Sequence, residues 1–180
     1  GSCGQGLVVL VETKRYGTCA LKMALSASSE DMLKRELTLW SRLLDHRNVA
    51  MLMGFGNLLG KHCSITPFAT KLSLERYVRA AKAEGKFPAE LRFGNDTVAN
   101  PLSHVARVGW VCQLASGLGW LHHCGVIHCD VKPKNVLVYD RRQNYGLGDY
   151  RRQDPQPEEI QLKLCDLGYA IEASTLDSGD

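Results

Sequence analysis

The sequence predicts an α+β fold, in which a strand-rich lobe is followed by an unlike, mostly helical lobe. Residues 1–68 combine short strand-like segments with one amphipathic helix, whereas the chain from residue 73 onward is dominated by helix-like segments. Strands gathered before helices are typical of α+β domains, because a parallel α/β sheet would alternate the two. A chain of 180 residues that is 44% apolar and 23% charged suits one globular domain.

The first strands and the first helix follow from local pattern. Residues 1–25 are punctuated by glycine and rich in Val, Leu, Thr and Tyr, which predicts a hairpin of strands. The SSED sequence at 28–31 predicts a helix N-terminus, and DHRN at 45–48 predicts the end of that helix. Apolar residues recur between them at steps of three and four, which predicts one buried face: Leu33, Leu37, Trp40 and Leu44.

The middle of the chain changes from strands to helices. Apolar runs at 49–55 and 63–68 predict two strands. A short helix is predicted over 73–83, a polar loop over 84–104 and a long helix over 103–123. One side of the long helix is predicted to be apolar and to hold Val105, Val108, Cys112, Ala115, Leu118 and Leu121.

The last predicted elements are strands over 126–139 and 160–166, which flank a polar insert at about 140–159. The insert is rich in Arg, Gln, Asp and Pro, and we expect a solvated loop there.

Charge and cysteine content exclude several classes of protein. The 22 basic and 19 acidic residues leave a net charge of +3, too small a bias to indicate a nucleic-acid partner or an anionic membrane. No apolar run reaches about 18 residues, so we expect no membrane-spanning segment. Seven cysteines are scattered and odd in number, which indicates free thiols in the cytoplasm or another reducing intracellular compartment.

The segment 128–135 reads HCDVKPKN and concentrates groups that phosphoryl transfer requires. Asp130 supplies a carboxylate for the attacking hydroxyl, Lys132 a cation for the transferred phosphoryl group, and Asn135 an amide oxygen for Mg²⁺. Taken alone, Asp130 could instead cap a local turn.

This segment closely resembles the catalytic loop of protein kinases, HRDxKxxN. The resemblance implies a bilobal kinase fold, ATP and Mg²⁺ as cofactors, and transfer of the γ-phosphoryl group to a hydroxyl of a protein substrate. It makes Asp130 and Lys132 catalytic residues and Asn135 a Mg²⁺ ligand. Lys132 and Pro133 are similar to the DLKPxN form of Ser/Thr kinases, which implies Ser/Thr specificity.

The start of the chain resembles a second kinase motif. GSCGQGLV at 1–8 is similar to the glycine-rich loop GxGxxGxV. This similarity implies that the backbone of Gly1, Gly4 and Gly6 comes close to the triphosphate.

Two further motifs follow in the family's order. The sequence CALK, which ends at Lys22, resembles the VAIK strand, whose lysine contacts the α- and β-phosphates. The resemblance implies that Glu36 is its ion-pair partner, with Glu30 as the rival acid. The sequence DLG, which begins at Asp166, resembles DFG and implies a second Mg²⁺ ligand. In isolation Lys22 would be read as a solvent-facing strand lysine, and the ordered set of motifs is what favours the kinase reading.

The same alignment implies a nucleotide pocket and a division of the chain. Within ITPFA, Thr66 would be the gatekeeper, and the Pro67 carbonyl and the Ala69 backbone would face adenine. Three residues would sandwich the base: Val8, Ala20 and Leu137.

The whole chain, 1–180, is interpreted as a partial kinase domain. It is divided into an N-lobe at 1–66, a hinge at 67–72 and an incomplete C-lobe at 73–180.

The sequence departs from the family at several points. Cys3 replaces the second glycine of the loop, Cys129 replaces the usual arginine before Asp130, and Leu167 replaces phenylalanine. Only residues 169–180 follow the DLG sequence, so the later parts of the family pattern are absent. We therefore expect exposed apolar surface on the long helix and poor activity of the chain as given. The alternative function is a catalytically silent, nucleotide-binding pseudokinase or a truncated scaffold or decoy module.

A zinc site is a further alternative. HHC at 122–124 and HC at 128–129 bring borderline ligands together. Structural zinc sites pair two separated clusters, and no second cluster follows, so the sequence disfavours this reading.

Overall fold

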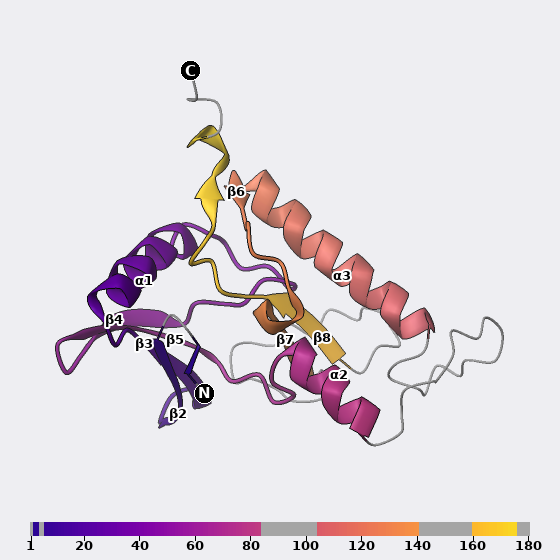
Figure 1. Ribbon diagram of the computed structural model, residues 1–180, viewed down its shortest axis with the longest axis horizontal. Helices are drawn as coiled ribbons and strands as arrows, with labels where there is room; N and C mark the ends of the chain where they lie inside the picture. Colours follow the sequence, from indigo (N-terminus) through magenta and orange to yellow (C-terminus); the bar gives the residue numbers. More distant parts are fainter. Residues whose placement is uncertain (1, 4–5, 84–103, 141–159, 176–180) are drawn as a thin grey trace.

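The computed structural model describes residues 2–3, 6–83, 104–140 and 160–175 (Figure 1). Its N-terminal part is an antiparallel sheet of five strands in the order β1-β2-β3-β5-β4. The strands are β1 (Ser2–Cys3), β2 (Gly6–Thr13), β3 (Gly17–Met23), β4 (Gly54–Leu58) and β5 (Lys61–Pro67). The main helices outside this part follow the sheet in sequence, which confirms the α+β fold class.

The register of the sheet gathers four residues of the predicted nucleotide site. Val8 lies opposite Lys22, and Ala20 lies opposite Thr66. Opposite residues of an antiparallel pair share a face, as do residues two positions apart along one strand. The four side chains therefore lie on the same face of the sheet.

Helix α1 (Ala27–Trp40) begins with a capping box. The Ser26 hydroxyl accepts a hydrogen bond from the Ser29 backbone N–H (3.2 Å), and the Ser29 hydroxyl accepts one from the Ser26 N–H (2.9 Å). Two orphan amides at the helix start are thereby satisfied. The predicted start at 28–31 is wrong, because the cap lies on Ser26.

Helix α1 also ends earlier than predicted, at Trp40 rather than at 45–48. Leu44, which was assigned to the buried face, is 73% exposed. The Trp40 indole N–H donates to the Ala50 carbonyl (2.8 Å), and the Ala50 N–H donates to the Leu164 carbonyl (2.7 Å). These hydrogen bonds tie the chain beyond α1 to β8, and the helix does not continue although the apolar spacing does.

Two antiparallel two-stranded sheets complete the described strands. One pairs β6 (Val126–Ile127) with β9 (Ile171–Glu172), and the other pairs β7 (Val136–Asp140) with β8 (Ile160–Leu164).

Two predicted strands have other bounds in the structure. The predicted strand over 126–139 is wrong, because the short 3₁₀ helix η1 (Pro133–Asn135) interrupts it and proline cannot donate to a ladder. The predicted strand over 49–55 is also wrong over most of its length, since β4 begins at Gly54. Beyond Asp140, the predicted insert lies outside the described residues.

Helices α2 (Leu74–Ala83) and α3 (His104–His123) match the predicted helices at 73–83 and 103–123 closely. The polar loop predicted over 84–104 lies, up to residue 103, outside the described residues. A second 3₁₀ helix, η2 (Ala173–Thr175), ends the described chain.

The buried side of α3 differs from the prediction. Leu121 is buried, but three members of the predicted face are exposed: Val108, Cys112 and Ala115. The side that packs on β8 is selected by Gln113, whose Oε1 accepts the Leu162 N–H (2.8 Å) and an Asn48 Nδ2–H (3.1 Å). Because apolar residues occur all round α3, their spacing did not define one stripe, and these polar contacts decide the rotation.

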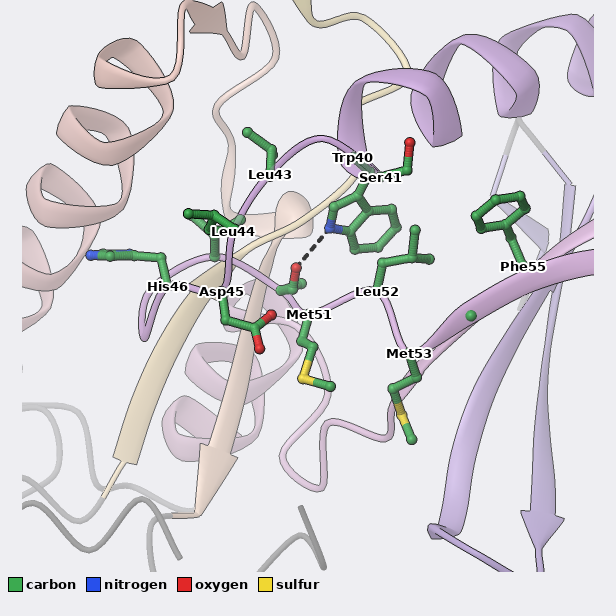
Figure 2. A pocket seen from close by; sticks show the side chains of 13 residues that line it. Trp40, Ser41, Leu43, Leu44, Asp45, His46, Met51, Leu52, Met53 and Phe55 are labelled. Carbon is green, nitrogen blue, oxygen red and sulfur yellow. Dashed lines mark hydrogen bonds between the residues drawn. The ribbon is translucent and has the colours of Figure 1, made fainter. Parts of the chain in front are cut away.

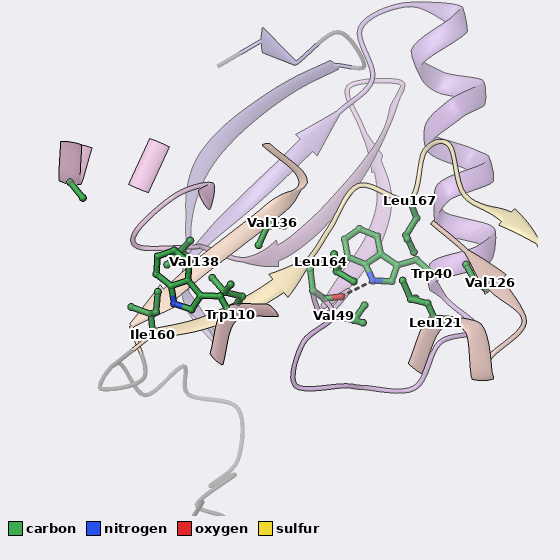
Figure 3. Close-up of a cluster of buried hydrophobic side chains, with 13 residues drawn as sticks. Trp40, Val49, Trp110, Leu121, Val126, Val136, Val138, Ile160, Leu164 and Leu167 are labelled. Atoms are coloured by element: carbon green, nitrogen blue, oxygen red, sulfur yellow. Dashed lines mark hydrogen bonds between the residues drawn. The ribbon is translucent and has the colours of Figure 1, made fainter. Parts of the chain in front are cut away.

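The main core joins the two parts of the molecule (Figure 3). Trp40 of α1 and Trp110 of α3 lie toward opposite ends of the cluster in this view, with Val136 of β7 and Leu164 of β8 between them and Val138 beside Trp110. Burial of each such side chain stabilises the fold by about 1.5–3 kcal/mol relative to exposure. Strands β7 and β8, which lead to the predicted Mg²⁺ ligand Asp166, are therefore anchored in the core.

No helix in the described ranges is long and apolar enough to cross a membrane. Six cysteines in these ranges carry free thiols: Cys19, Cys63, Cys112, Cys124, Cys129 and Cys165.

Candidate active site

The Lys22 ammonium joins three segments that are far apart in the sequence. Its Nζ lies 2.6 Å from Oε2 of Glu36 in α1 and 3.1 Å from Oδ1 of Asp166, which follows β8. Burial by itself lowers the pKa of Lys22, but attraction to the two carboxylates and hydrogen bonds with them outweigh burial and raise it above its usual value. Lys22 is therefore positively charged at neutral pH.

Glu36 is almost fully buried, at 1% exposure. Its Oε1 accepts a hydrogen bond from the Leu167 backbone N–H (3.2 Å). Burial raises the pKa of the Glu36 carboxyl, although Lys22 acts in the opposite direction. This side chain thus binds α1 both to β3 and to the DLG sequence.

The rival acid Glu30 points elsewhere. Its Oε1 lies 2.7 Å from Nδ1 of His62 and 3.5 Å from Nζ of Lys34. Tertiary structure therefore brings Glu36, and not Glu30, to Lys22.

The backbone at Asp166 has φ +67°, a left-handed conformation that is uncommon outside glycine. It lies just beyond the end of β8, after Cys165, whose N–H donates to the Asn135 carbonyl (2.9 Å). The turn at this position directs the Asp166 carboxylate to Lys22. The hydrogen bond from Cys165 to Asn135 therefore keeps the segments that carry Asp166 and Asn135 side by side.

Two polar side chains of the HCDVKPKN segment, Lys132 and Asn135, converge on the carboxylate of Asp130. Lys132 Nζ lies 2.7 Å and Asn135 Nδ2 lies 2.8 Å from Oδ2 of Asp130. Asn135 Nδ2 also donates to the Asp130 carbonyl (3.0 Å). The hydrogen bond from Lys132, followed by that from Asn135, lowers the pKa of Asp130 below its usual range. Asp130 is therefore an ionised, oriented acceptor.

A buried histidine links this segment to Asp166. His128 is 1% exposed, and its Nδ1 accepts the Asp130 backbone N–H (3.3 Å). The neutral ring then donates from Nε2 to the Cys165 carbonyl (3.1 Å). Between them, Cys129 has φ +60° and an exposed side chain.

The predicted nucleotide pocket is only partly described. Pro67 ends β5, and its carbonyl accepts a hydrogen bond from the Tyr139 hydroxyl (3.1 Å). Ala69 is buried, and its carbonyl accepts the Leu72 N–H (2.9 Å). The predicted sandwich and gatekeeper positions are all partly exposed: Val8, Ala20, Thr66 and Leu137.

Of the predicted phosphate-loop glycines, Gly1 and Gly4 lie outside the described residues. Gly6 has φ +148°, and a Cβ atom there would clash with the Met23 carbonyl oxygen. A side chain is therefore excluded at Gly6 by the close approach of β2 to the end of β3.

The described donors fit a magnesium-bound triphosphate. Asp166 offers a carboxylate, and Asn135 offers an amide oxygen, because both of its hydrogen bonds given above are donated from nitrogen. Such oxygen ligands are those Mg²⁺ prefers. Lys22 and Lys132, which both precede these ligands in the sequence, add the cations that phosphate groups require.

Two hollows of about 250 and 300 Å³ lie elsewhere on the molecule. The first follows the end of α1 and the chain up to β4, where Trp40, Met51, Met53 and Phe55 surround it (Figure 2). None of the described site residues lines either hollow. The candidate site lies instead at the ion pairs of Lys22 and of Asp130, because charged side chains can carry out phosphoryl transfer.

Within the described ranges, no three His, Cys, Asp or Glu side chains are grouped closely enough to hold a metal ion. His122, from the zinc alternative, is exposed near the end of α3, whereas His128 is buried in the loop. These two histidines thus have different surroundings.

Sequence reasoning missed Tyr139 and the polar contacts of Asn48. Asn48 is 2% exposed, and its Nδ2 donates to the Leu162 carbonyl (2.8 Å). Asn48 belongs to the DHRN segment at 45–48, which was expected only to end a helix, so the sequence did not indicate that its side chain is buried and hydrogen-bonded. Only the pairing of distant segments reveals both roles.

A protein-family model described as protein tyrosine and serine/threonine kinase matches residues 1–178. Among curated proteins, the serine/threonine-protein kinase PKZ1 of Phytophthora infestans is 37% identical over 62 residues, which cover 34% of this chain and 16% of that protein. The Aurora kinase of Schizosaccharomyces pombe is 27% identical over 174 residues, covering 93% and 39%. The probable serine/threonine-protein kinase gdt8 of Dictyostelium discoideum is 23% identical over 159 residues, covering 87% and 10%. The chain thus spans well under half the length of each of these relatives.

Proposed function

The chain belongs to the family of protein tyrosine and serine/threonine kinases, and we propose that it forms the nucleotide-binding and catalytic part of an ATP-dependent protein serine/threonine kinase. The observation that carries this proposal is the Lys22 ammonium held between Glu36 and Asp166. The Lys22 side chain is 17% exposed. A largely desolvated ion pair contributes little net stability, so a function is the better reason for this arrangement.

We assign the following roles to the residues around the nucleotide. Lys22, oriented by Glu36, would contact the α- and β-phosphates, and Asp166 and Asn135 would hold Mg²⁺. When bound, Mg²⁺ and ATP supply the γ-phosphoryl group and part of its charge neutralisation. The backbone of Gly1, Gly4 and Gly6 would lie over the phosphates.

The proposed roles in the transfer itself fall on the second cluster. Asp130 accepts hydrogen bonds and is ionised, so it can orient the attacking hydroxyl and receive its proton. Lys132, which contacts Asp130, would supply the cation that meets the charge on the transferred group.

The base and the substrate class complete the proposal. Val8, Ala20 and Leu137 would sandwich adenine, beside Thr66 and the backbone of residues 67–69. Lys132 and Pro133, together with the similarity to relatives named as serine/threonine-protein kinases, support a serine or threonine hydroxyl of a protein as acceptor.

The division of the chain belongs to the same proposal, with an N-lobe at 1–66, a hinge at 67–72 and a C-lobe at 73–180. The free thiols support a reducing intracellular compartment.

The test is transfer of labelled phosphate from MgATP to casein or to the protein itself, followed by identification of the phosphorylated amino acid. Lys22→Met and Asp130→Asn should each abolish transfer, whereas Lys14→Met, which changes an exposed lysine of the same lobe, should retain it. Phosphotyrosine as the only product would refute the serine/threonine assignment. Undiminished transfer by either site variant would refute the site.

A second candidate is a nucleotide-binding module without phosphoryl transfer. It is favoured by Cys129, which stands where the family has arginine, and by Cys3 at the second glycine position. Magnesium-dependent binding of ATP together with no transfer by the wild-type protein would favour this function.

A further inference from the structure

Lys134 carries an ammonium group near the candidate catalytic carboxylate, and the proposed mechanism does not use it. It lies in η1, one residue before Asn135, and its side chain is exposed to solvent. Asn135 is 4% exposed, and its Nδ2 lies 2.8 Å from Oδ2 of Asp130. Asn135 therefore faces Asp130, whereas Lys134 faces the solvent, from which a protein substrate must approach.

The hydrogen bond from Asn135 limits the distance between Lys134 and Asp130. Consecutive Cα atoms are about 3.8 Å apart and an asparagine side chain reaches about as far, so the Cα atom of Lys134 lies within about 11 Å of Oδ2 of Asp130. An extended substrate advances by about 3.3 Å per residue. A side chain about two or three residues from the acceptor hydroxyl is therefore at a similar distance from Asp130, where the lysine ammonium on its flexible stem can meet it.

The charge of Lys134 is not balanced within the catalytic segment. Asp130, the single acid of HCDVKPKN, is already paired with Lys132 at 2.7 Å. Within the part of the chain that the structure describes, Lys134 forms no ion pair. Its ammonium group therefore remains available to a carboxylate of a substrate.

Helix α2 adds to the positive charge near η1. It packs against η1 and lies beside β7 (Figure 1). Its three basic residues are all exposed: Arg76, Arg79 and Lys82. Glu75 is its single acidic residue and lies 3.8 Å from Arg79. Because exposed charges interact over about 8–10 Å at physiological ionic strength, α2 favours an acidic chain beside η1 over a basic one.

We propose that Lys134 is a specificity-determining residue, which directs transfer to serine or threonine hydroxyls that have an aspartate or glutamate within about three residues. A carboxylate at such a position gains an ion pair with Lys134, whereas an arginine or lysine there is repelled. This inference rests on the proposed function and deepens it, because it names acidic protein segments as the substrate class.

The test uses short peptides that contain one serine and differ in a single neighbour, which is aspartate, alanine or arginine at each nearby position in turn. The kcat/KM for transfer from MgATP is measured for each peptide with the wild type, Lys134→Glu and Lys134→Ala. At the best position, the wild type should prefer aspartate to arginine by about threefold to tenfold, as expected when an exposed ion pair is replaced by a repulsion. Lys134→Glu should reverse this preference, and Lys134→Ala should remove most of it.

The matched control is Lys14→Glu. It makes the same change of charge at an exposed lysine in the turn between β2 and β3, and should keep the wild-type ratio. The wild-type ratio should also fall as KCl is added, because salt screens exposed ion pairs.

Transfer without a preference for aspartate, or with a preference for arginine, overturns the inference and leaves the proposed function intact. A preference for aspartate that is undiminished in the Lys134 variants overturns the assignment to Lys134. Should Lys134→Glu not fold, Lys134→Ala decides. Failure of the wild type to phosphorylate any peptide overturns the proposed function and the inference with it.

Discussion

Nζ of Lys22 lies 2.6 Å from Oε2 of Glu36, fourteen residues later in the chain. Glu30, which lies about 1.7 turns earlier on the same helix, contacts His62 instead. One helix thus presents two acids to two different partners, and only one of them lies beside the DLG sequence. Substitutions of Glu36 and Glu30 therefore form a matched test of the site.

Glu36→Gln should lower kcat/KM by more than about tenfold, because the neutral amide no longer orients the Lys22 ammonium for the phosphates. The measurement is steady-state phosphoryl transfer at several ATP concentrations. Glu30→Gln is the control and should stay within about twofold, since its ion pairs are partly exposed. Equal losses in the two variants would contradict the assignment of Glu36.

Lys132→Met should raise the pKa of Asp130 toward its usual range, because the hydrogen bond from Lys132 is the largest cause of its depression. A carboxyl with a depressed pKa in the folded state contributes stability above its usual pKa of 3.8, and that contribution is lost as the pH falls through the lower, folded value. The contribution should shrink in Lys132→Met.

Carboxyl titration by NMR measures the Asp130 pKa directly. Lys134→Met removes an exposed neighbouring ammonium and should shift it far less. An Asp130 pKa that does not move in Lys132→Met would mean that the 2.7 Å contact is not maintained in solution.

Gly117→Ala should destabilise the fold by about 1–3 kcal/mol through overpacking. A Cβ atom at Gly117 would lie 2.6 Å from the Asn48 carbonyl oxygen and 3.0 Å from Leu164 Cδ1. Gly119 is on the same helix and has nothing within 4 Å of such an atom, so Gly119→Ala should stabilise by up to about 1 kcal/mol. Urea unfolding of the two variants should give free-energy changes of opposite sign.

Gln113→Leu should cost about 1–3 kcal/mol, because it leaves the buried Leu162 N–H without the acceptor that Gln113 provides. The matched control is Gln161→Leu, which removes an exposed hydrogen bond to the Arg47 carbonyl and should cost less than about 0.5 kcal/mol. Thermal or urea unfolding measures both, and a loss confined to Gln161→Leu would contradict the network.

The sequence by itself determined the chemical groups and their order along the chain. Helices α2 and α3 were predicted almost to the residue, because apolar periodicity and polar flanks are properties of neighbouring residues. The groups assigned to the candidate site, three carboxylates, two ammonium groups and an amide, were likewise readable from short motifs. Those motifs also predicted the family, which the match over residues 1–178 confirms.

Tertiary structure alone decided which groups meet. Helix α1 ends at Trp40 because its indole bonds to Ala50, and the buried side of α3 is chosen by Gln113, which no apolar stripe marks. The contact between Tyr139 and Pro67 joins residues 72 positions apart. Periodicity reports only which side of an element is apolar, whereas a hydrogen bond between distant segments depends on how those elements pack. The hydrogen-bond partners of polar side chains are therefore determined by the tertiary structure.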